Sequence, residues 1–369
     1  MRIGVLFGGR SGEHEVSLAS AAAIVHHLDP SRYEPVPILI GKDGRWSQPE
    51  RPPTVVKASE LIEHARLRAA GTVRNHQDGI PGRPRINEPS AMVQELALDV
   101  VFPVLHGPYG EDGTVQGLLE MIDMPYVGAG VLASAVGIDK AVMKQLFAAY
   151  NLPQVDYRII RQSDWPSTPV AICKMIASEL GFPVFVKPAN LGSSVGISKV
   201  TSANNLKAAV SYAAEFDRKV VVEQAVPNAR EIECAVLGYN QLEASIPGEV
   251  VPSREFYDYE AKYVDEGSVL RIPAPLDAEL TDKVQHLAVT AFRAIDGSGM
   301  ARVDFLLNDE TKELFVSEVN TIPGFTTVSM YPKLWEASGV AYVELLDRLI
   351  QLALEKPVSY THLTLPTKA

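Results

Sequence analysis

The stretch from Met300 to Phe325 carries more polar side chains than packing requires, at a spacing that could do chemistry. It reads as two short strands joined by a polar turn. Because strand side chains repeat every second residue, each strand has two faces. The first strand places Ala301, Val303 and Phe305 on one face and Arg302 and Asp304 on the other. The returning strand, Leu314 to Asn320, places Phe315, Ser317 and Val319 on one face and Val316, Glu318 and Asn320 on the other.

A turn centred on Thr311 would set Asp304 opposite Glu318 and Arg302 opposite Asn320. That register gathers two carboxylates, an amide and a guanidinium on one patch. Carboxylate and amide oxygens are hard ligands that suit Mg²⁺ held together with substrate phosphates. The alternative is a hairpin with one solvated polar face, and the rest of the chain has to decide between the two.

Two further stretches favour a phosphate site. The loop Lys187 to Gly196, KPANLGSSVG, offers backbone N–H groups that can wrap around a phosphate, while Lys187 supplies positive charge. A flexible turn explains the glycines but not a lysine at the end of an apolar strand, where a charge needs a partner. The stretch Phe256 to Tyr263, FYDYEAKY, is typical of a lid or binding loop. The P-loop pattern G-x-x-x-x-G-K-[ST] is absent from the sequence.

The elements that position these stretches begin with an α/β pattern. A strand over Arg2 to Phe7 leads through a glycine turn into a helix that ends near Leu28, and this geometry favours an anion at the helix start. Strands over Val36 to Ile40 and Val100 to Leu105 are expected to be parallel, because long connections separate them. Between them we expect a surface insertion with one helix near Ala58 to Ala69. The G-x-G-x-x-G fingerprint is absent, which argues against a dinucleotide site.

The remaining chain alternates strands and helices and then becomes antiparallel. The predicted elements are a helix over 139–150, a strand over 156–160, a helix over 170–180, strands over 184–187 and 197–200, a helix over 203–216, strands over 219–223, 231–237, 243–251 and 269–272, a helix over 276–295, the hairpin described above, and a helix over 342–354. We divide the chain into an N-terminal α/β domain (1–130), a central subdomain with the phosphate loop (131–222), a C-terminal subdomain with the metal site and lid (223–357), and a tail (358–369) that continues no pattern.

Composition describes a soluble globular protein that handles small molecules. The formal charge of −11 gives no general basic footprint for nucleic acid or an acidic membrane. No stretch reaches the length of a transmembrane helix, and the start lacks the features of a secretion signal. Cys173 and Cys234 share no metal-like spacing and read as reduced core residues of a cytosolic protein.

Five stretches together resemble the D-alanine:D-alanine ligase family of the ATP-grasp superfamily. They read GGRSGEHEVS, HGPYGEDGT, VKPANLGSSVGISKV, FYDYEAKY, and ARVDF with SEVNTIPGF. The resemblance covers nearly everything from Arg2 to Leu354, apart from the insertion. It implies α/β and α+β layers in a three-domain ATP-grasp architecture with an N-terminal Rossmann-like parallel-sheet domain. It also implies a cytoplasmic homodimer that uses ATP and two Mg²⁺ or Mn²⁺ ions to join two D-alanine molecules for peptidoglycan synthesis.

The resemblance implies a role for each matching residue. Lys140 and Lys187, together with the loop around Ser194, would hold ATP phosphates, and Lys262 would hold the γ-phosphate. The adenine would be bound by Glu223, Gln224, Ala225 and Val226. Glu231 would bind the ribose. Asp304, Glu318 and Asn320 would hold the metal ions. Glu13 would orient the ammonium of the first D-alanine and be linked through Ser193 to Tyr263, with His106 lining that site. Arg302 and the Gly324 N–H would stabilise an oxyanion, and Ser329 with Met330 would receive the second carboxylate. The wording Gln224-Ala225-Val226 departs from the lysine-aromatic wording of some members.

The implied reaction passes through an acylphosphate, which a closing lid would protect from water. Two alternatives within the enzymes are a D-alanine:D-lactate and a D-alanine:D-serine ligase, and Tyr263 argues against the first. A non-catalytic binding protein with two α/β lobes is an alternative of another class. Glu13 has a simpler alternative role, as an acid in the first turn of a helix.

Overall fold

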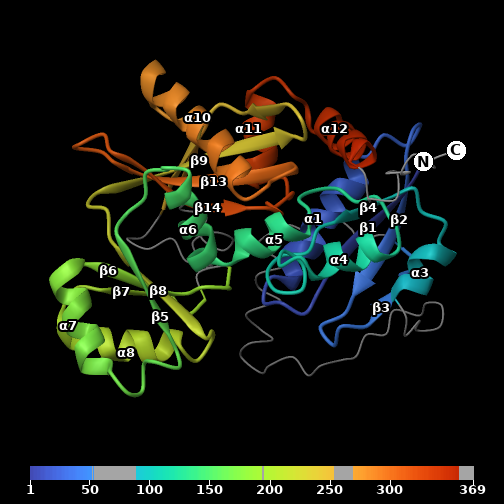
Figure 1. The fold of residues 1–369 in the computed structure, drawn as a ribbon. Coiled ribbons are helices and arrows are strands. Elements are labelled where there is room, and N and C mark those ends of the chain that lie inside the picture. Colours follow the sequence, from blue (N-terminus) through green and yellow to red (C-terminus); the bar gives the residue numbers. More distant parts are fainter. Residues whose placement is uncertain (52, 54–88, 193–194, 253–268, 357–369) are drawn as a thin grey trace, which may run out of the picture.

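The N-terminal part is a small, mostly parallel sheet. The structure, a computed structural model, describes residues 1–51, 53, 89–192, 195–252 and 269–356 (Figure 1). The sheet order is β3-β2-β1-β4, with β1 parallel to β2 and β4 as predicted and β3 antiparallel to β2. Its elements are β1 (Arg2–Gly8), α1 (His14–His27), β2 (Glu34–Ile40), β3 (Trp46–Ser47), α3 (Pro89–Glu95), β4 (Val100–Pro103) and α4 (Thr114–Met121). The helix expected at 58–69 lies outside the described residues.

The turn after β1 depends on glycine. Gly8 has φ of +92°, and a Cβ at this position would lie 2.3 Å from the Ile40 carbonyl oxygen. A side chain is therefore excluded both by the backbone conformation and by the neighbouring strand. This turn brings the chain into α1 at the carboxyl end of β1, the edge at which open α/β sheets place ligands.

The central part is a four-stranded sheet with order β5-β8-β6-β7, in which every pair is antiparallel. It contains β5 (Tyr157–Arg161), α7 (Pro169–Glu179), β6 (Val184–Pro188), β7 (Ser198–Val200), α8 (Ala203–Ala213) and β8 (Lys219–Gln224), preceded by α5 (Val131–Ile138) and α6 (Lys140–Ala149). Helices α7 and α8 cover one face of the sheet (Figure 1). Helix α5 was not predicted.

The third part contains the largest sheet, with order β12-β11-β9-β13-β14 and β10 beside β9. Its elements are β9 (Ala229–Gly238), β10 (Leu242–Ala244), β11 (Gly248–Val251), β12 (Val269–Arg271), α10 (Ala278–Ala294), β13 (Gly299–Asn308), β14 (Leu314–Asn320), α11 (Met330–Ala337) and α12 (Tyr342–Glu355). The single strand predicted over 243–251 is wrong. Pro247 has no N–H for a ladder, and the Ile246 N–H donates to Ser338 Oγ at 2.9 Å, so β10 and β11 are separate. Helix α11 was also missed.

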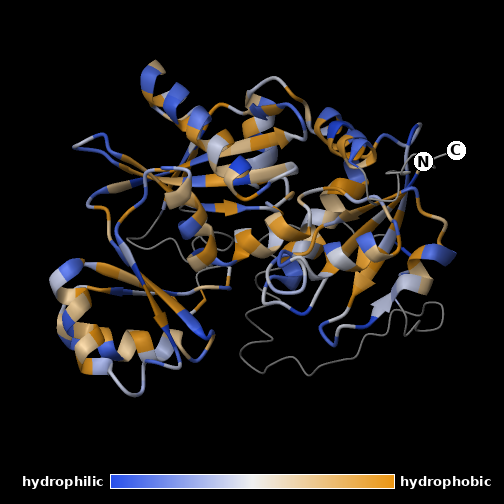
Figure 2. Cartoon of the chain, viewed as in Figure 1, coloured by the Kyte–Doolittle hydropathy of each residue, from blue (hydrophilic) through white to orange (hydrophobic). Residues whose placement is uncertain are grey.

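Strand β9 separates two hydrophobic cores by simple alternation. Ile232, Cys234 and Val236 belong to the core beneath α10, whereas Ala235 and Leu237 belong to a core shared with α11 and α12. The second core also takes residues from β1, α1 and β4, so α12 packs against the N-terminal part. Figure 2 shows hydrophobic residues along these strands and a mixture of hydrophobic and hydrophilic residues on α10 and α12.

A β-bulge corrects the predicted faces of the returning strand. The ladder pairs Asp304 with Glu318 but Phe305 with Val316, so Ser317 is an extra residue on β14. As a result Val316 and Val319 lie in the same core, although strict alternation assigned them to opposite faces. Glu318 and Asn320 still lie on the polar face.

Candidate functional site

The hairpin register predicted from the sequence is confirmed. Asp304 pairs with Glu318 and Arg302 with Asn320 across β13 and β14. Both Asp304 carboxylate oxygens accept hydrogen bonds from Arg302, from Nε and Nη2, each at 2.7 Å. Asn320 Nδ2 donates to Asp304 Oδ2 at 2.9 Å. The Arg302 and Asp304 side chains are only 16% and 17% exposed, so this patch is not the freely solvated face of the alternative reading.

Glu233 joins this patch from the neighbouring strand, and the sequence analysis missed it. It pairs directly with Asp304 across β9 and β13. Its Oε2 lies 3.0 Å from Arg302 Nε, and its side chain is 8% exposed. The available signal was its position two residues after Glu231, which puts both on one face of a strand.

Lys187 has the partner that its position required. Its Nζ lies 2.6 Å from Glu223 Oε2, and Lys144 Nζ lies 3.1 Å from Glu223 Oε1. Burial of Glu223 would raise its carboxyl pKa, but the two lysines outweigh burial and hold that pKa at about 2. Burial also opposes the charge of Lys187, yet Glu223 raises the lysine's pKa. Lys144 on α6 is the residue of this group to which the sequence analysis gave no role.

Lys140 connects the glycine loop with the hairpin patch. Its Nζ donates to the Leu191 carbonyl oxygen at 2.8 Å and lies 3.5 Å from Glu318 Oε2. It begins α6, whose N-cap Asp139 accepts from the N–H groups of Ala141 and Val142, and its own N–H donates to the Ala189 carbonyl. The start of α6 is thereby fixed against the phosphate loop.

Glu13 lies between the loop that contains Gly107 and the loop that contains Gly192. A Cβ built on Gly192 would lie 3.3 Å from Glu13 Oε2, and one built on Gly107 would lie 3.5 Å from it. Glu13 is the N-cap residue of α1, and within the described residues its side chain makes no hydrogen bond that caps the helix. Ser193, Ser194, Lys262 and Tyr263 lie outside the described residues.

His106 and Glu111, which belong to the N-terminal part, contact the backbone of Ile322 in the C-terminal part. His106 Nδ1 lies 3.1 Å from the Ile322 carbonyl oxygen, which requires the Nδ1–H tautomer. Burial lowers the pKa of His106 and so favours the neutral ring. Glu111 Oε2 accepts from the Gly107 N–H at 2.7 Å. Burial, followed by the charge of Glu13, raises the pKa of Glu111 to about 8, against the opposing backbone N–H groups of Gly107 and Ile322.

The loop after β14 brings Gly324 and Ser329 together. A Cβ on Gly324 would lie 2.8 Å from Ser329 Oγ, so a side chain does not fit there without a shift. Ser329 is the N-cap residue of α11, and its Oγ accepts a hydrogen bond from the Thr326 N–H at 3.0 Å. The side chain of Met330 packs in the core.

The residues after Glu223 are tied to the central sheet. The Gln224 N–H donates to the Asp156 carbonyl oxygen at 2.9 Å and the Ala225 N–H to Pro183 at 3.0 Å. The Gln224 side chain turns back to the Leu180 carbonyl at 3.2 Å. Among these predicted adenine contacts, Glu223 is therefore the buried polar side chain. Glu231 lies on β9 opposite Leu306, and Val226 follows the end of β8.

The donor set of the hairpin fits a magnesium ion only with outside ligands. No group of three or more histidine, cysteine, aspartate or glutamate side chains with metal-binding geometry occurs among the residues that the structure describes. Asp304 and Glu318 supply carboxylates and Asn320 an amide oxygen, and both carboxylates lie beside cations. Hard oxygen donors of this kind hold Mg²⁺ together with substrate phosphates and water.

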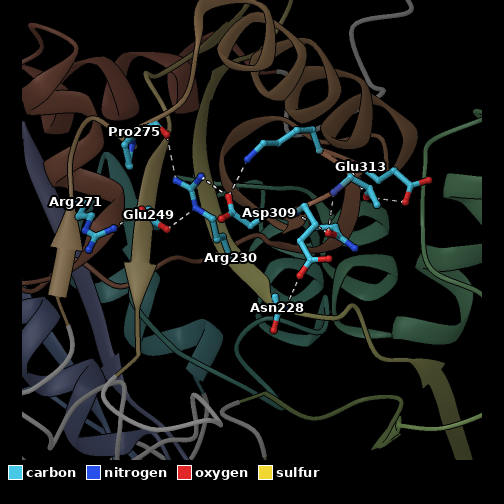
Figure 3. A network of polar contacts seen from close by, with 11 residues as sticks. Asn228, Arg230, Glu249, Arg271, Pro275, Asp309 and Glu313 are labelled. Atoms are coloured by element: carbon cyan, nitrogen blue, oxygen red, sulfur yellow. Dashed lines mark hydrogen bonds and ion pairs between the residues drawn. The ribbon is translucent and has the colours of Figure 1, made fainter.

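A second polar network lies beside the turn of the same hairpin (Figure 3). Arg230 Nε lies 2.7 Å from Glu249 Oε1, and Arg271 Nη1 lies 3.3 Å from Glu249 Oε2. Arg230 also reaches Asp309 Oδ1 at 3.2 Å in the turn of the hairpin. This network connects β9, β11 and β12 with the β13–β14 turn.

A mostly parallel N-terminal sheet followed by two antiparallel sheets, with Lys140 of α6 facing the Glu318 carboxylate of the last sheet, is the ATP-grasp architecture. Two family models match, described as D-ala D-ala ligase N-terminus over residues 2–129 and D-ala D-ala ligase C-terminus over residues 146–351. The chain therefore belongs to the D-alanine–D-alanine ligase family.

Individual relatives agree with the family models. The chain is 49% identical to the D-alanine–D-alanine ligase of Halothermothrix orenii over 96% of this chain and 98% of that protein. It is 46% identical to the enzyme of the same name from Geobacillus thermodenitrificans, over 96% of each.

Solved structures are similar over almost the whole chain. The D-alanine–D-alanine ligase of Coxiella burnetii has a TM-score of 0.76 and 35% identity, over 96% of this chain and 94% of that one. The VanG D-Ala:D-Ser ligase of Enterococcus faecalis has the same TM-score and 34% identity, over 95% of this chain and 99% of that one. Among the described residues, no helix has both the length and the apolar character needed to cross a membrane.

Proposed function

We propose that this protein is an ATP-dependent ligase that joins two D-alanine molecules into D-alanyl-D-alanine and releases ADP and phosphate. The observation that carries the proposal is the meeting of Lys140 with Glu318, 3.5 Å apart. Lys140 begins α6 and also donates to the glycine loop, so this contact brings the cations beside that loop to the oxygen donors of the hairpin, as the two sides of a metal–phosphate complex require. The membership of the D-alanine–D-alanine ligase family supplies the substrate class.

The first step is attack by the carboxylate of one D-alanine on the γ-phosphorus of ATP, which breaks the bond to ADP and forms D-alanyl phosphate. Lys140 and Lys187 hold the phosphates and neutralise their spreading charge. Glu13 binds the ammonium group of this D-alanine, with His106 beside it. A closed site is needed, because water would hydrolyse the acylphosphate.

The second step is attack by the free amine of the other D-alanine on the acyl carbon. The tetrahedral oxyanion accepts hydrogen bonds from Arg302 and from the Gly324 N–H. Phosphate then leaves, the amide bond remains, and the attacking nitrogen loses a proton. Ser329, with the Met330 backbone, receives the carboxylate of this second D-alanine.

Asp304, Glu318 and Asn320 would hold two Mg²⁺ or Mn²⁺ ions. When bound, these ions would offset negative charge on the ATP phosphates. Arg302 keeps Asp304 oriented through two hydrogen bonds of 2.7 Å, so this ligand is fixed in place before any ion arrives.

Further assignments rest on the family match. Ser193 and Tyr263 would link Glu13 to the aromatic stretch, Ser194 and Lys262 would contact phosphate, Glu223 to Val226 the adenine, and Glu231 the ribose. We also propose the three-part division at 130 and 222, a homodimer, and a cytoplasmic role in peptidoglycan precursor synthesis.

The test is a phosphate-release assay with ATP, Mg²⁺ and D-alanine, with the product identified by mass spectrometry. D-serine and D-lactate are offered separately, each with D-alanine, because the VanG enzyme is a D-Ala:D-Ser ligase. We expect phosphate release to require D-alanine and D-alanyl-D-alanine to be the main product. If D-alanyl-D-serine were the main product with D-serine and D-alanine at equal concentrations, the second substrate would be D-serine rather than D-alanine. ATP turnover that does not depend on D-alanine would refute the ligase activity.

A further inference from the structure

Lys144 is a buried lysine that the proposed mechanism does not use. It lies on α6, and its side chain is 1% exposed. Its Nζ is 3.1 Å from Glu223 Oε1 and 5.2 Å from the centroid of the Tyr157 ring. Burial lowers the pKa of Lys144, against the charge of Glu223. A buried ammonium is costly unless it is paired, so packing alone would favour an apolar side chain at this position.

The two lysines together fix the orientation of the Glu223 carboxylate. Lys187 contacts Oε2 at 2.6 Å and Lys144 contacts Oε1 at 3.1 Å, so neither oxygen is free to rotate away. An ionised carboxylate has about four acceptor positions and donates nothing. Two of these positions are therefore still available to donors on a ligand.

The surroundings of Glu223 restrict which ligand group it can bind. The neighbouring N–H groups of Gln224 and Ala225 are already donated to Asp156 and Pro183. The Glu223 carboxylate near the end of β8 thus presents an acceptor, and this acceptor matches the exocyclic amino group of adenine. The corresponding oxygen of guanine is itself an acceptor.

We propose that Lys144 is a positioning residue that holds Glu223 as a fixed acceptor for the 6-amino group of the purine, and thereby selects adenine nucleotides. The inference rests on the proposed use of ATP. Lys144 itself touches no substrate. Lys187 would be shared between Glu223 and the phosphates, whereas Lys144 forms its ion pair with Glu223 and lies over the Tyr157 ring.

The experiment compares three nucleotides by calorimetry with Mg²⁺ and without D-alanine. They are ADP, purine riboside diphosphate, which lacks the amino group, and inosine diphosphate, which carries oxygen instead. The wild-type protein is expected to bind ADP about tenfold or more tightly than purine riboside diphosphate, the range of a hydrogen bond to a charged group. Lys144→Met is expected to weaken ADP about tenfold and to leave purine riboside diphosphate within about twofold.

Two further variants complete the design. Lys144→Gln keeps a donor without the charge and is expected to retain part of the preference for ADP. Lys174→Met makes the same change on the exposed face of α7 and is expected to alter no affinity. Circular dichroism and thermal unfolding identify any variant that fails to fold, and Lys144→Gln then carries the comparison.

Each result decides the proposal. Equal weakening of ADP and purine riboside diphosphate would mean that Lys144 only supports the fold. Equal affinity of the wild-type protein for the two nucleotides would mean that Glu223 does not read the amino group. Either result leaves the ligase intact, whereas absence of binding to any nucleotide would refute the proposed function itself.

Discussion

Asp304 on β13 lies directly opposite Glu318 on β14, and the extra residue Ser317 lies immediately before Glu318. The bulge lets Val316 stay in the core while Glu318 faces the polar patch. The same two strands can therefore bury one face completely and present carboxylates on the other. Bulges next to active sites commonly re-aim a side chain in this way.

The first prediction concerns these two carboxylates. Asp304→Asn and Glu318→Gln should each lower kcat with ATP and D-alanine by at least about 100-fold, because a metal-held phosphate loses a charged ligand. Far-UV circular dichroism should be unchanged. Glu313→Gln, at an exposed position next to the same hairpin turn, is the matched control and should keep wild-type activity. Normal turnover in both site variants would exclude a metal site here.

The second prediction concerns Arg302. Arg302→Lys keeps a charge but not the fork that holds Asp304 at 2.7 Å, so it should lower kcat about 100- to 1,000-fold. The KM for ATP should change much less, since the lysines of the other sheet hold the phosphates. Steady-state kinetics with each substrate varied in turn provide the check. A loss confined to the KM for ATP would argue against an oxyanion role.

The third prediction is a pH dependence of stability from Glu111. Its pKa is raised from 4.5 to about 8 in the folded protein. Between these two values the unfolded chain has released the proton while the folded protein keeps it, so stability falls as pH rises. Below 4.5 both states are protonated, and above about 8 both are ionised, so the slope is confined to this window.

The measurement is the Tm of the wild-type protein and of Glu111→Gln across that pH range. Glutamine can still accept from the Gly107 N–H but does not titrate. The variant should therefore gain on the wild-type protein steadily from pH 5 to pH 8. Parallel curves for the two proteins would show that Glu111 is ionised throughout.

The fourth prediction concerns the network of Figure 3. Glu249 is 3% exposed and pairs with both Arg230 and Arg271, so Glu249→Gln removes the buried counter-charge of both guanidinium groups and leaves Arg230 with the more exposed Asp309. We expect a loss of about 3 kcal/mol in the free energy of unfolding. Urea denaturation measures this loss. The control is Glu243→Gln, which breaks the more exposed ion pair between Glu243 and Arg348 and should cost less than about 1 kcal/mol.

Much of the fold follows from period and spacing. The parallel arrangement of β1, β2 and β4 follows from long connections, and the pairing of Asp304 with Glu318 follows from the position of one turn. Helix α11 was missed. The break between β10 and β11 was also missed, although Pro247 signals it in the sequence; the partner of the Ile246 N–H, Ser338, lies far away in the chain.

The site residues divide in the same way. Residues within conspicuous motifs, such as Lys187 and Asp304, could be predicted because their charges need partners that packing does not supply. Lys144, Glu233 and Glu111 were missed. The role of each depends on a residue of another element. Lys144 pairs with Glu223, Glu233 with Arg302, and Glu111 contacts the Ile322 backbone.

The core that α12 shares with β1, α1 and β4 has a consequence for the order of assembly. Leu345 and Ile350 of α12 belong to the same core as Val5 and Phe102, yet they are among the last described residues to leave the ribosome. The face of the first sheet that belongs to this core is therefore covered only in part, by α1, while the two later sheets are synthesised. The core of the N-terminal part is therefore completed only when the C-terminal helix has been synthesised. A chain that ends before α12 would expose apolar residues of the first sheet and tend to aggregate.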